Sequence, residues 1–198
     1  MQRTPVAVLG TLAEFHREPI SYDLAALVRL VRGVRPDLLC LDLTLEQWNR
    51  RDFGDLPPEY RDALLPLAHQ TDIVVVPIGG DRPLQEAVAT GWRGAVSAVL
   101  RRWLAGLQCT APSPDAVNEG PRHFVADLLY EGIAALAGRA TRRSWHAHVT
   151  HLVDHVVAVV RRDPGCRVMV AVNVRYCHHI RHALRRHPEV ALVRYSEL

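Results

Sequence analysis

Residues 21–43, SYDLAALVRLVRGVRPDLLCLDL, decide the fold of this chain. The first half of the stretch carries apolar residues at helical spacing: Leu24, Leu27, Val28 and Val31. Ser21 is a plausible N-cap, and Gly33 and Pro36 favour the end of a helix. Residues 38–43 form a short apolar run that is typical of a strand buried on both faces. The stretch therefore predicts a helix followed by a buried strand, the second half of a β-α-β unit.

Four more apolar runs of this kind lie along the chain, at residues 6–9, 73–78, 168–174 and 190–193. Between residues 81 and 162 the pattern is helical, apart from a Pro-, Ser- and Asn-rich loop at 108–121. The sequence predicts an α/β fold with a mostly parallel sheet of about five strands flanked by helices. We expect a single domain over residues 1–198, with an all-helical insertion or cap at about 81–162 between strands three and four.

Composition narrows the classes of partner. The net charge is +3, and the arginine pairs are scattered along the chain instead of gathering in one segment, which argues against nucleic-acid binding. The four cysteines make no CxxC pair, which favours a reducing compartment. The chain shows no signal peptide and no apolar run long enough to span a membrane. We therefore expect a cytoplasmic protein without a membrane partner, and homo-oligomerisation is left open.

The candidate site residues follow the predicted strands, because ligands of open parallel sheets bind outside the carboxyl ends of the strands. Glu14 and His16 come soon after the first strand and could share a metal ion or act as a base with its orienting partner. Asp42 ends the second strand, where a buried carboxylate needs a partner. The structural alternatives are a turn or capping role for the first two residues, and a helix cap or an arginine pair for Asp42.

Histidines gather in the last part of the chain. His148, His151 and His155 share one helical face by spacing, and His178 and His182 are four residues apart. Such spacings can hold zinc or haem iron, but the partly solvated side of an amphipathic helix is the preferred interpretation of the first group. No phosphate loop, GxGxxG turn or GxSxG elbow is present.

Three segments resemble the superfamily that groups TraB and TIKI-type proteins with ChaN-like and erythromycin-esterase-like proteins. The first segment is the strand that ends in Gly10-Thr11 with a histidine soon after, and the second is RPDLLCLD at residues 35–42. The third is the late turn, strand and helix that start at Pro164-Gly165 and continue to His178-His179-Ile180. The resemblance implies the α/β fold. Members of the superfamily include proposed metal-dependent peptidases, an esterase and a haem-binding protein.

The chain also departs from that pattern. Residues 12–15 separate Gly10-Thr11 from His16, and the acid after the second strand is Asp42, where the superfamily commonly has Glu. Asn173 and Arg175 stand where the superfamily has glycines, and Tyr176 stands where it has its late histidine.

Three functional hypotheses follow. The leading one is a metal-dependent hydrolase of unknown substrate that acts on a small-molecule or peptide ligand. Its proposed residues are Glu14 and His16 as ligands of a divalent metal, Asp42 as ligand or base, His178 as ligand or proton carrier, and Arg175 as the group that stabilises developing negative charge. The second hypothesis is a non-enzymatic protein that binds haem or another small ligand. The third is a catalytically inactive accessory protein that works through its surface.

Overall fold

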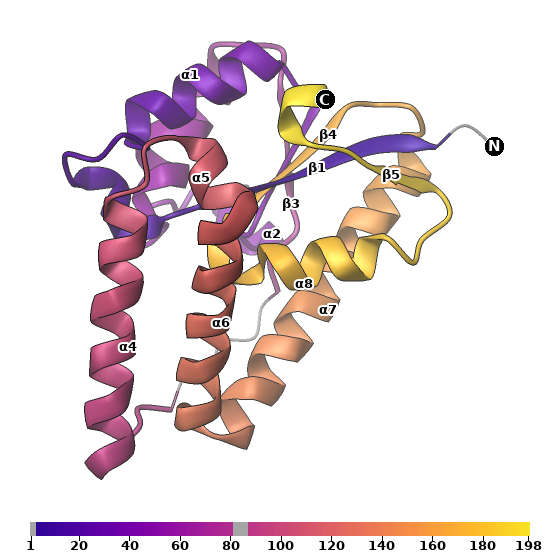
Figure 1. The fold of residues 1–198 in the computed structure, drawn as a ribbon. Coiled ribbons are helices and arrows are strands. Elements are labelled where there is room, and N and C mark those ends of the chain that lie inside the picture. Colours follow the sequence, from indigo (N-terminus) through magenta and orange to yellow (C-terminus); the bar gives the residue numbers. More distant parts are fainter. Residues whose placement is uncertain (1–2, 81–86) are drawn as a thin grey trace.

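The predicted parallel sheet is confirmed. The computed structural model describes residues 3–80 and 87–198, and for Glu14 only the backbone. Five strands, all parallel, form one sheet in the order β3-β2-β4-β1-β5 (Figure 1). The strands are β1 (Thr4–Thr11), β2 (Leu38–Leu41), β3 (Val74–Pro77), β4 (Val168–Asn173) and β5 (Val190–Leu192). Because every strand runs the same way, the carboxyl ends of β1, β2 and β4 meet at one edge.

Both faces of the sheet are covered, which explains why its strands read as continuous apolar runs. Val6 and Val8 of β1 face one core with α7 (Arg139–Arg162) and α8 (Val174–Leu184). Ala7 and Leu9, which alternate with them, face a second core that α1 (Leu24–Val34), a π-helical turn η2 (Glu59–Leu64) and α3 (Leu65–His69) cover. The side chains of β1 from residue 6 to residue 9 are all buried.

The chain between β3 and β4 is helical in the part that the structure describes, and the first residues of the expected insertion, 81–86, lie outside it. Its helices are α4 (Gly91–Cys109), α5 (Pro114–Asn118), α6 (Gly120–Ala137) and α7. α4 and α6 lie side by side, with α4 on the outside and α6 between it and α7, and they share a small apolar cluster of their own, while α7 packs on the sheet (Figure 1). None of the helices in the described ranges is long and apolar enough to cross a membrane.

Local structure differs from expectation at four places. Asp23, not Ser21, caps α1, because its carboxylate accepts the Ala26 N–H at 2.7 Å. α1 continues through Gly33 to Val34 and ends where Arg35 turns left-handed. A short helix α2 (Leu45–Arg50) follows β2, and its capping box of Thr44 and Gln47 was not predicted. α5 lies within residues 108–121, which were expected to form a loop. Two 3₁₀ turns, η1 (Ala13–Arg17) and η3 (Tyr195–Glu197), complete the chain.

Candidate functional site

His16 is a structural histidine in this fold. It lies on η1 directly after β1 and is 2% exposed. Its Nε2 accepts the Leu12 N–H at 2.9 Å, and its Nδ1 donates to the Tyr22 carbonyl at 2.7 Å. Since an N–H can only donate and a carbonyl can only accept, the ring is neutral with its proton on Nδ1. Burial agrees with this state, because it lowers the pKa of His16 to about 4.

The residues expected to bind a metal do not fit one as they are placed. Both ring nitrogens of His16 are engaged by backbone groups, so neither has a lone pair to give. Glu14 lies on the same turn, but its side chain is outside the described residues. Among residues 3–80 and 87–198 no three His, Cys, Asp or Glu side chains are grouped to hold a metal ion. A metal centre and a haem site therefore stay predictions, and we derive no chemical step through either.

Asp42 and His148 form a pair at the carboxyl edge of the sheet. Asp42 follows β2, and His148 comes from the middle of α7; Nε2 of the imidazole lies 2.8 Å from Oδ2 of the carboxylate. Both side chains are mostly buried, at 10% exposed for His148 and 19% for Asp42. The imidazole also packs beside Tyr176, with ring centroids 5.1 Å apart. A carboxylate that holds an imidazole in this way is the arrangement that orients a general base.

Arg175 and His178, the other two predicted residues, lie on the first turns of α8 and point to different neighbours. The guanidinium of Arg175 stacks on Trp145 and Tyr176, with its central carbon 5.2 and 4.7 Å from the ring centroids. His178 is exposed, and its Nδ1 lies 3.6 Å from a carboxylate oxygen of Asp127 on α6. The structure thus gives Asp42, Arg175 and His178 separate partners.

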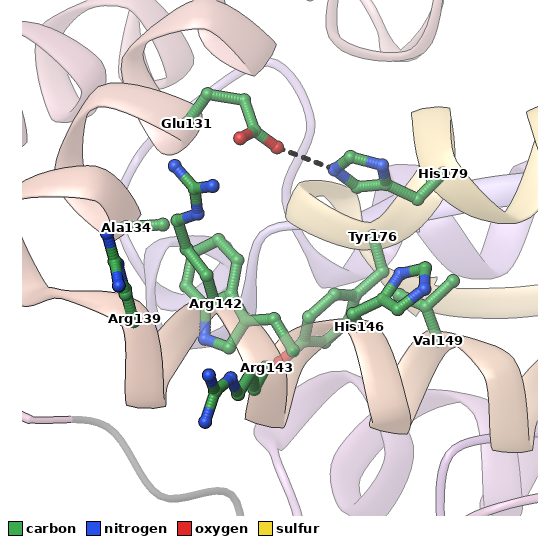
Figure 2. Close-up of a pocket in the computed structure, with 10 residues that line it drawn as sticks. Glu131, Ala134, Arg139, Arg142, Arg143, His146, Val149, Tyr176 and His179 are labelled. Atoms are coloured by element: carbon green, nitrogen blue, oxygen red, sulfur yellow. Dashed lines mark hydrogen bonds and ion pairs between the residues drawn. The ribbon is translucent and has the colours of Figure 1, made fainter.

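A charged hollow lies between α6, α7 and the start of α8. This cavity, here called the arginine pocket, has a volume of about 520 Å³ (Figure 2). Its lining residues are Glu131, Ala134, Arg139, Arg142, Arg143, Trp145, His146, Val149, Tyr176 and His179. One wall is aromatic, because Trp145 and Tyr176 meet edge to face with centroids 6.0 Å apart. Glu131, the carboxylate of the lining, is engaged by His179 Nε2 at 2.7 Å.

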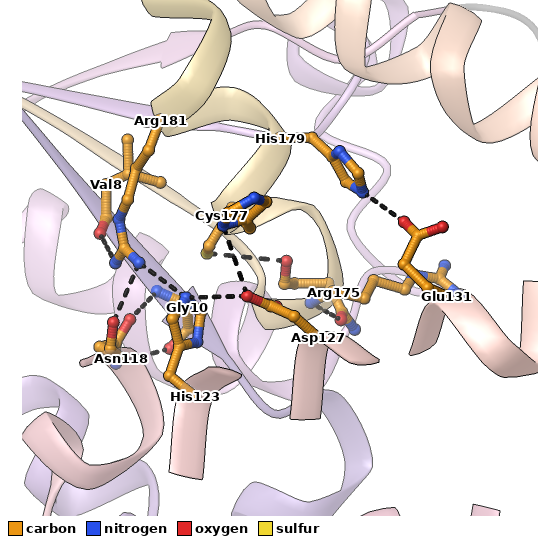
Figure 3. A network of polar contacts seen from close by, with 12 residues as sticks. Val8, Gly10, Asn118, His123, Asp127, Glu131, Arg175, Cys177, His179 and Arg181 are labelled. Atoms are coloured by element: carbon orange, nitrogen blue, oxygen red, sulfur yellow. Dashed lines mark hydrogen bonds and ion pairs between the residues drawn. The ribbon is translucent and has the colours of Figure 1, made fainter. Parts of the chain in front are cut away.

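Three side chains seal the free edge of β1 beyond the short strand β5. β5 ends at Leu192, opposite Val6, so the later polar groups on that side of β1 need other partners. Arg181 donates to the Val8 carbonyl at 2.7 Å, and Asn118 Oδ1 accepts the Gly10 N–H at 2.5 Å (Figure 3). The Tyr22 hydroxyl donates to the Gly10 carbonyl at 3.0 Å.

A titratable cluster adjoins this seal. Asp127 lies 3.5 Å from His123 Nε2, and Arg181 bonds the same histidine nitrogen at 3.0 Å (Figure 3). Burial raises the pKa of Asp127 to about 6, although His178 opposes the shift. Burial, together with the charge of Arg181, lowers the pKa of His123 to about 4. The cluster therefore joins α6 to α8 through groups whose charges burial disfavours.

Sequence reasoning missed the arginine pocket and the seal of β1. Arg142, Arg143 and His146 follow Arg139 by three, four and seven residues, so the four side chains share one helical face. That spacing was the available signal, but the pair at 142 and 143 was counted among scattered surface charges. Asn118 gave no signal, since it stood in an apparent loop among other turn-forming residues.

Comparison of the chain with family models, with curated proteins and with solved structures gave no match. The resemblance to the TraB, ChaN-like and erythromycin-esterase-like superfamily therefore stays a prediction. The arginine pocket and the Asp42–His148 pair are the two features of the structure that suggest a function.

Proposed function

We propose that this protein binds a small organic anion in the arginine pocket. The observation that carries the proposal is the state of Arg139, Arg142 and Arg143: they line one cavity, and in the described part of the chain none of them forms an ion pair. Three guanidinium groups that pair with no carboxylate of the described residues produce a positive potential, and their planar donors match carboxylate and phosphate oxygens.

The other lining groups favour a ligand that has a flat ring beside its negative charge. Trp145 is 8% exposed, and its indole Nε1 has no hydrogen-bond acceptor among the described residues. The ring of Tyr176 adds an aromatic surface, and Arg175 stacks on both rings. The volume lies within the range of about 300–1,000 Å³ that is usual for small-molecule sites. An aromatic carboxylate or a nucleoside monophosphate has this combination of ring and charge.

Isothermal titration calorimetry with benzoate, citrate, inorganic phosphate and adenosine monophosphate tests the proposal. We expect a ring-bearing anion to bind, and Arg142→Gln and Arg143→Gln each to weaken its affinity about tenfold, the loss expected for one charged hydrogen bond of about 1.4 kcal/mol. Arg50→Gln is the matched control, since Arg50 is an exposed arginine on α2 that pairs with Glu46. Equal affinity in all four proteins, or no binding by any of the four anions, would refute the proposal.

A second candidate function, hydrolysis, is favoured by the Asp42–His148 pair. In this reaction His148 would take a proton from water while the water oxygen bonds to the carbonyl carbon of an ester or amide, and the proton would pass to the leaving group as its bond breaks. Water is the proposed nucleophile. The Cys177 thiol is fully buried, and burial raises its pKa to about 12. This candidate keeps the hydrolase activity that the superfamily resemblance implies.

A panel of p-nitrophenyl esters and fluorogenic peptides tests hydrolysis. We expect turnover that Asp42→Asn and His148→Gln each reduce at least a hundredfold, because removing the base or its orienting group typically costs that much. His155→Gln, on the same helix, should leave the turnover unchanged. Activity that survives both substitutions at the pair would exclude this mechanism.

A further inference from the structure

An uncharged apolar stripe runs along the exposed side of α4. It consists of Trp92, Val96, Val99 and Trp103, whose exposed fractions are 69%, 41%, 50% and 66%. Successive members stand four, three and four residues apart, which is the spacing of a coiled-coil seam. The inward side of the same helix carries Leu100 and Leu104, which pack on α6. α4 therefore has two apolar sides, and this fold covers one of them.

α6 extends the stripe. Arg122 bonds the Leu107 carbonyl and Gly132 lies beside Leu100, so α4 and α6 run antiparallel. Successive side chains of a helix point about 100° apart around its axis. In an antiparallel pair, the side chains that come one residue before the inward ones therefore point to the same side of the pair on both helices. Val99 and Trp103 precede Leu100 and Leu104, while Val125 and Leu128 precede Ala126 and Leu129 of α6. These four residues with Trp92 and Val96 form what we call the tryptophan face.

We propose that the tryptophan face binds a second copy of this chain and forms a two-fold symmetric dimer. In a two-fold symmetric dimer, both subunits use the same surface patch, so a helix at the axis packs on its own copy in the opposite direction. The spacing of four, three and four residues is the same in both directions and therefore fits such a packing. With the two-fold axis level with Ser97 and Ala98, an antiparallel pair places Trp92 against the partner's Trp103. The same register places Val96 against the partner's Val99.

The area of the face is sufficient for a stable dimer. Trp92 and Trp103 are about two thirds exposed, and a Trp side chain offers up to about 250 Å², so with its four aliphatic residues the face presents roughly 600 Å² of apolar surface. About two thirds of a homodimer interface is apolar, so the whole contact would bury about 900 Å² per partner. A standard interface buries about 800 Å² per partner.

The charges of α4 define the alternative that the test has to separate from a dimer, an anionic lipid surface. The arginines of α4, Arg93, Arg101 and Arg102, lie off the stripe, so the stripe itself has no charge to hold a phosphate headgroup. The three arginines still make α4 basic, and α4 has no acidic residue. Anionic vesicles are therefore the second probe of the test.

Sedimentation velocity of the full chain between 1 and 100 µM is the first experiment. We expect wild-type protein to sediment at twice the 22.2 kDa chain mass. Val96→Glu and Val99→Lys should each weaken dimerisation at least tenfold, because each buries two unpaired charges at the axis. The double variant should dimerise again, since each Glu at position 96 then meets the partner's Lys at position 99. Leu45→Glu, at a leucine on α2 that is 62% exposed and lies outside the tryptophan face, is the control that should stay dimeric.

Three results would overturn the proposal. They are a monomeric wild type at 100 µM, a dimer that both single substitutions leave intact, and a monomer that instead floats with phosphatidylserine vesicles. If both single variants dissociate and the double variant does not recover, the antiparallel register is wrong. Circular dichroism of every variant separates loss of the dimer from loss of the fold.

Discussion

Asp42 and His148, 106 residues apart in the chain, meet at 2.8 Å between Oδ2 and Nε2 at the carboxyl edge of the sheet. The contact fastens the helical segment between β3 and β4 to the loop after β2. Burial makes each group depend on the other, because a mostly buried carboxylate or imidazole without a partner loses its hydration without compensation. The pair therefore adds a polar contact to the apolar packing that holds α7 on the sheet.

A double-mutant cycle measures the energy of this contact. We expect Asp42→Asn and His148→Gln each to lower the free energy of urea-induced unfolding by about 1–3 kcal/mol, with a coupling energy of about 1–2 kcal/mol between them. The control cycle uses Glu46→Gln and Arg50→Gln, an exposed ion pair on α2 for which we expect under about 0.5 kcal/mol. A coupling no larger than that of the control would mean that the pair does not anchor α7.

His16 makes the stability of the fold depend on pH in the acid range. Its pKa falls from 6.5 to about 4 on folding, so between these values the unfolded chain binds more protons than the folded chain. The free energy of unfolding should consequently decrease as the pH is lowered from 6.5 to 4, by up to about 3 kcal/mol from this residue. Gln at this position can keep one acceptor and one donor but does not titrate. Urea unfolding of His16→Gln at pH 7 and pH 4.5 should therefore show a smaller loss than wild type.

The exposed His69 of α3 provides the matched control for that measurement. His69→Gln should keep the full pH dependence of the wild type. His123 and Asp127 also shift, in opposite directions, but both are present in every protein compared, so their contributions cancel in the difference. An unaltered slope in His16→Gln would show that His16 is not held in its neutral form.

Gly10 is required by close packing and not by its backbone conformation. A Cβ at this position would lie 2.9 Å from Val174 and 3.0 Å from Asn118 Oδ1, the oxygen that accepts the Gly10 N–H. We expect Gly10→Ala to destabilise the protein by about 1–3 kcal/mol, as over-packing does. Gly33→Ala is the contrast, because a Cβ there meets nothing within 4 Å and α1 gains about 0.5–1 kcal/mol of helix propensity. Thermal unfolding curves of the two variants should move in opposite directions, and a Gly10→Ala protein as stable as wild type would contradict the packing argument.

The sheet could be predicted from sequence because its signal is local. Residues such as Val6 to Leu9 are buried on both faces, and this condition produces a continuous apolar run whatever the partner strands are. Strand order carries no such local signal. β4 lies between β1 and β2 in the sheet, although the whole helical segment separates it from both strands in the sequence. The cap of α1 was misplaced by two residues, since Ser21 and Asp23 are both good caps and the local sequence does not distinguish them.

The site was less predictable, because its pairings are long-range. The sequence placed His16 and Asp42 after strands, as the structure has them, but it could not give His16 its partners, the Leu12 N–H and the Tyr22 carbonyl. Nor could it select His148 from the three histidines of its helical face, since only the position of α7 on the sheet brings that one to Asp42.

Arg181 supplies the last prediction, which concerns the free edge of β1. Its guanidinium donates to the Val8 carbonyl at 2.7 Å, to the Asn118 carbonyl at 2.9 Å, and contacts His123 Nε2 at 3.0 Å. A lysine keeps the charge but has a single terminal nitrogen. It cannot donate to both the Val8 and the Asn118 carbonyls, which the two terminal nitrogens of the arginine guanidinium reach. We expect Arg181→Lys to cost about 1–3 kcal/mol in urea unfolding, because a partly buried carbonyl is left unsatisfied, whereas Arg185→Lys on the exposed turn after α8 should cost under about 0.5 kcal/mol. An unsealed strand edge also invites pairing between chains, so light scattering at 37 °C should rise faster for Arg181→Lys than for the control. Equal stability and equal scattering of the two variants would mean that β1 does not need this seal.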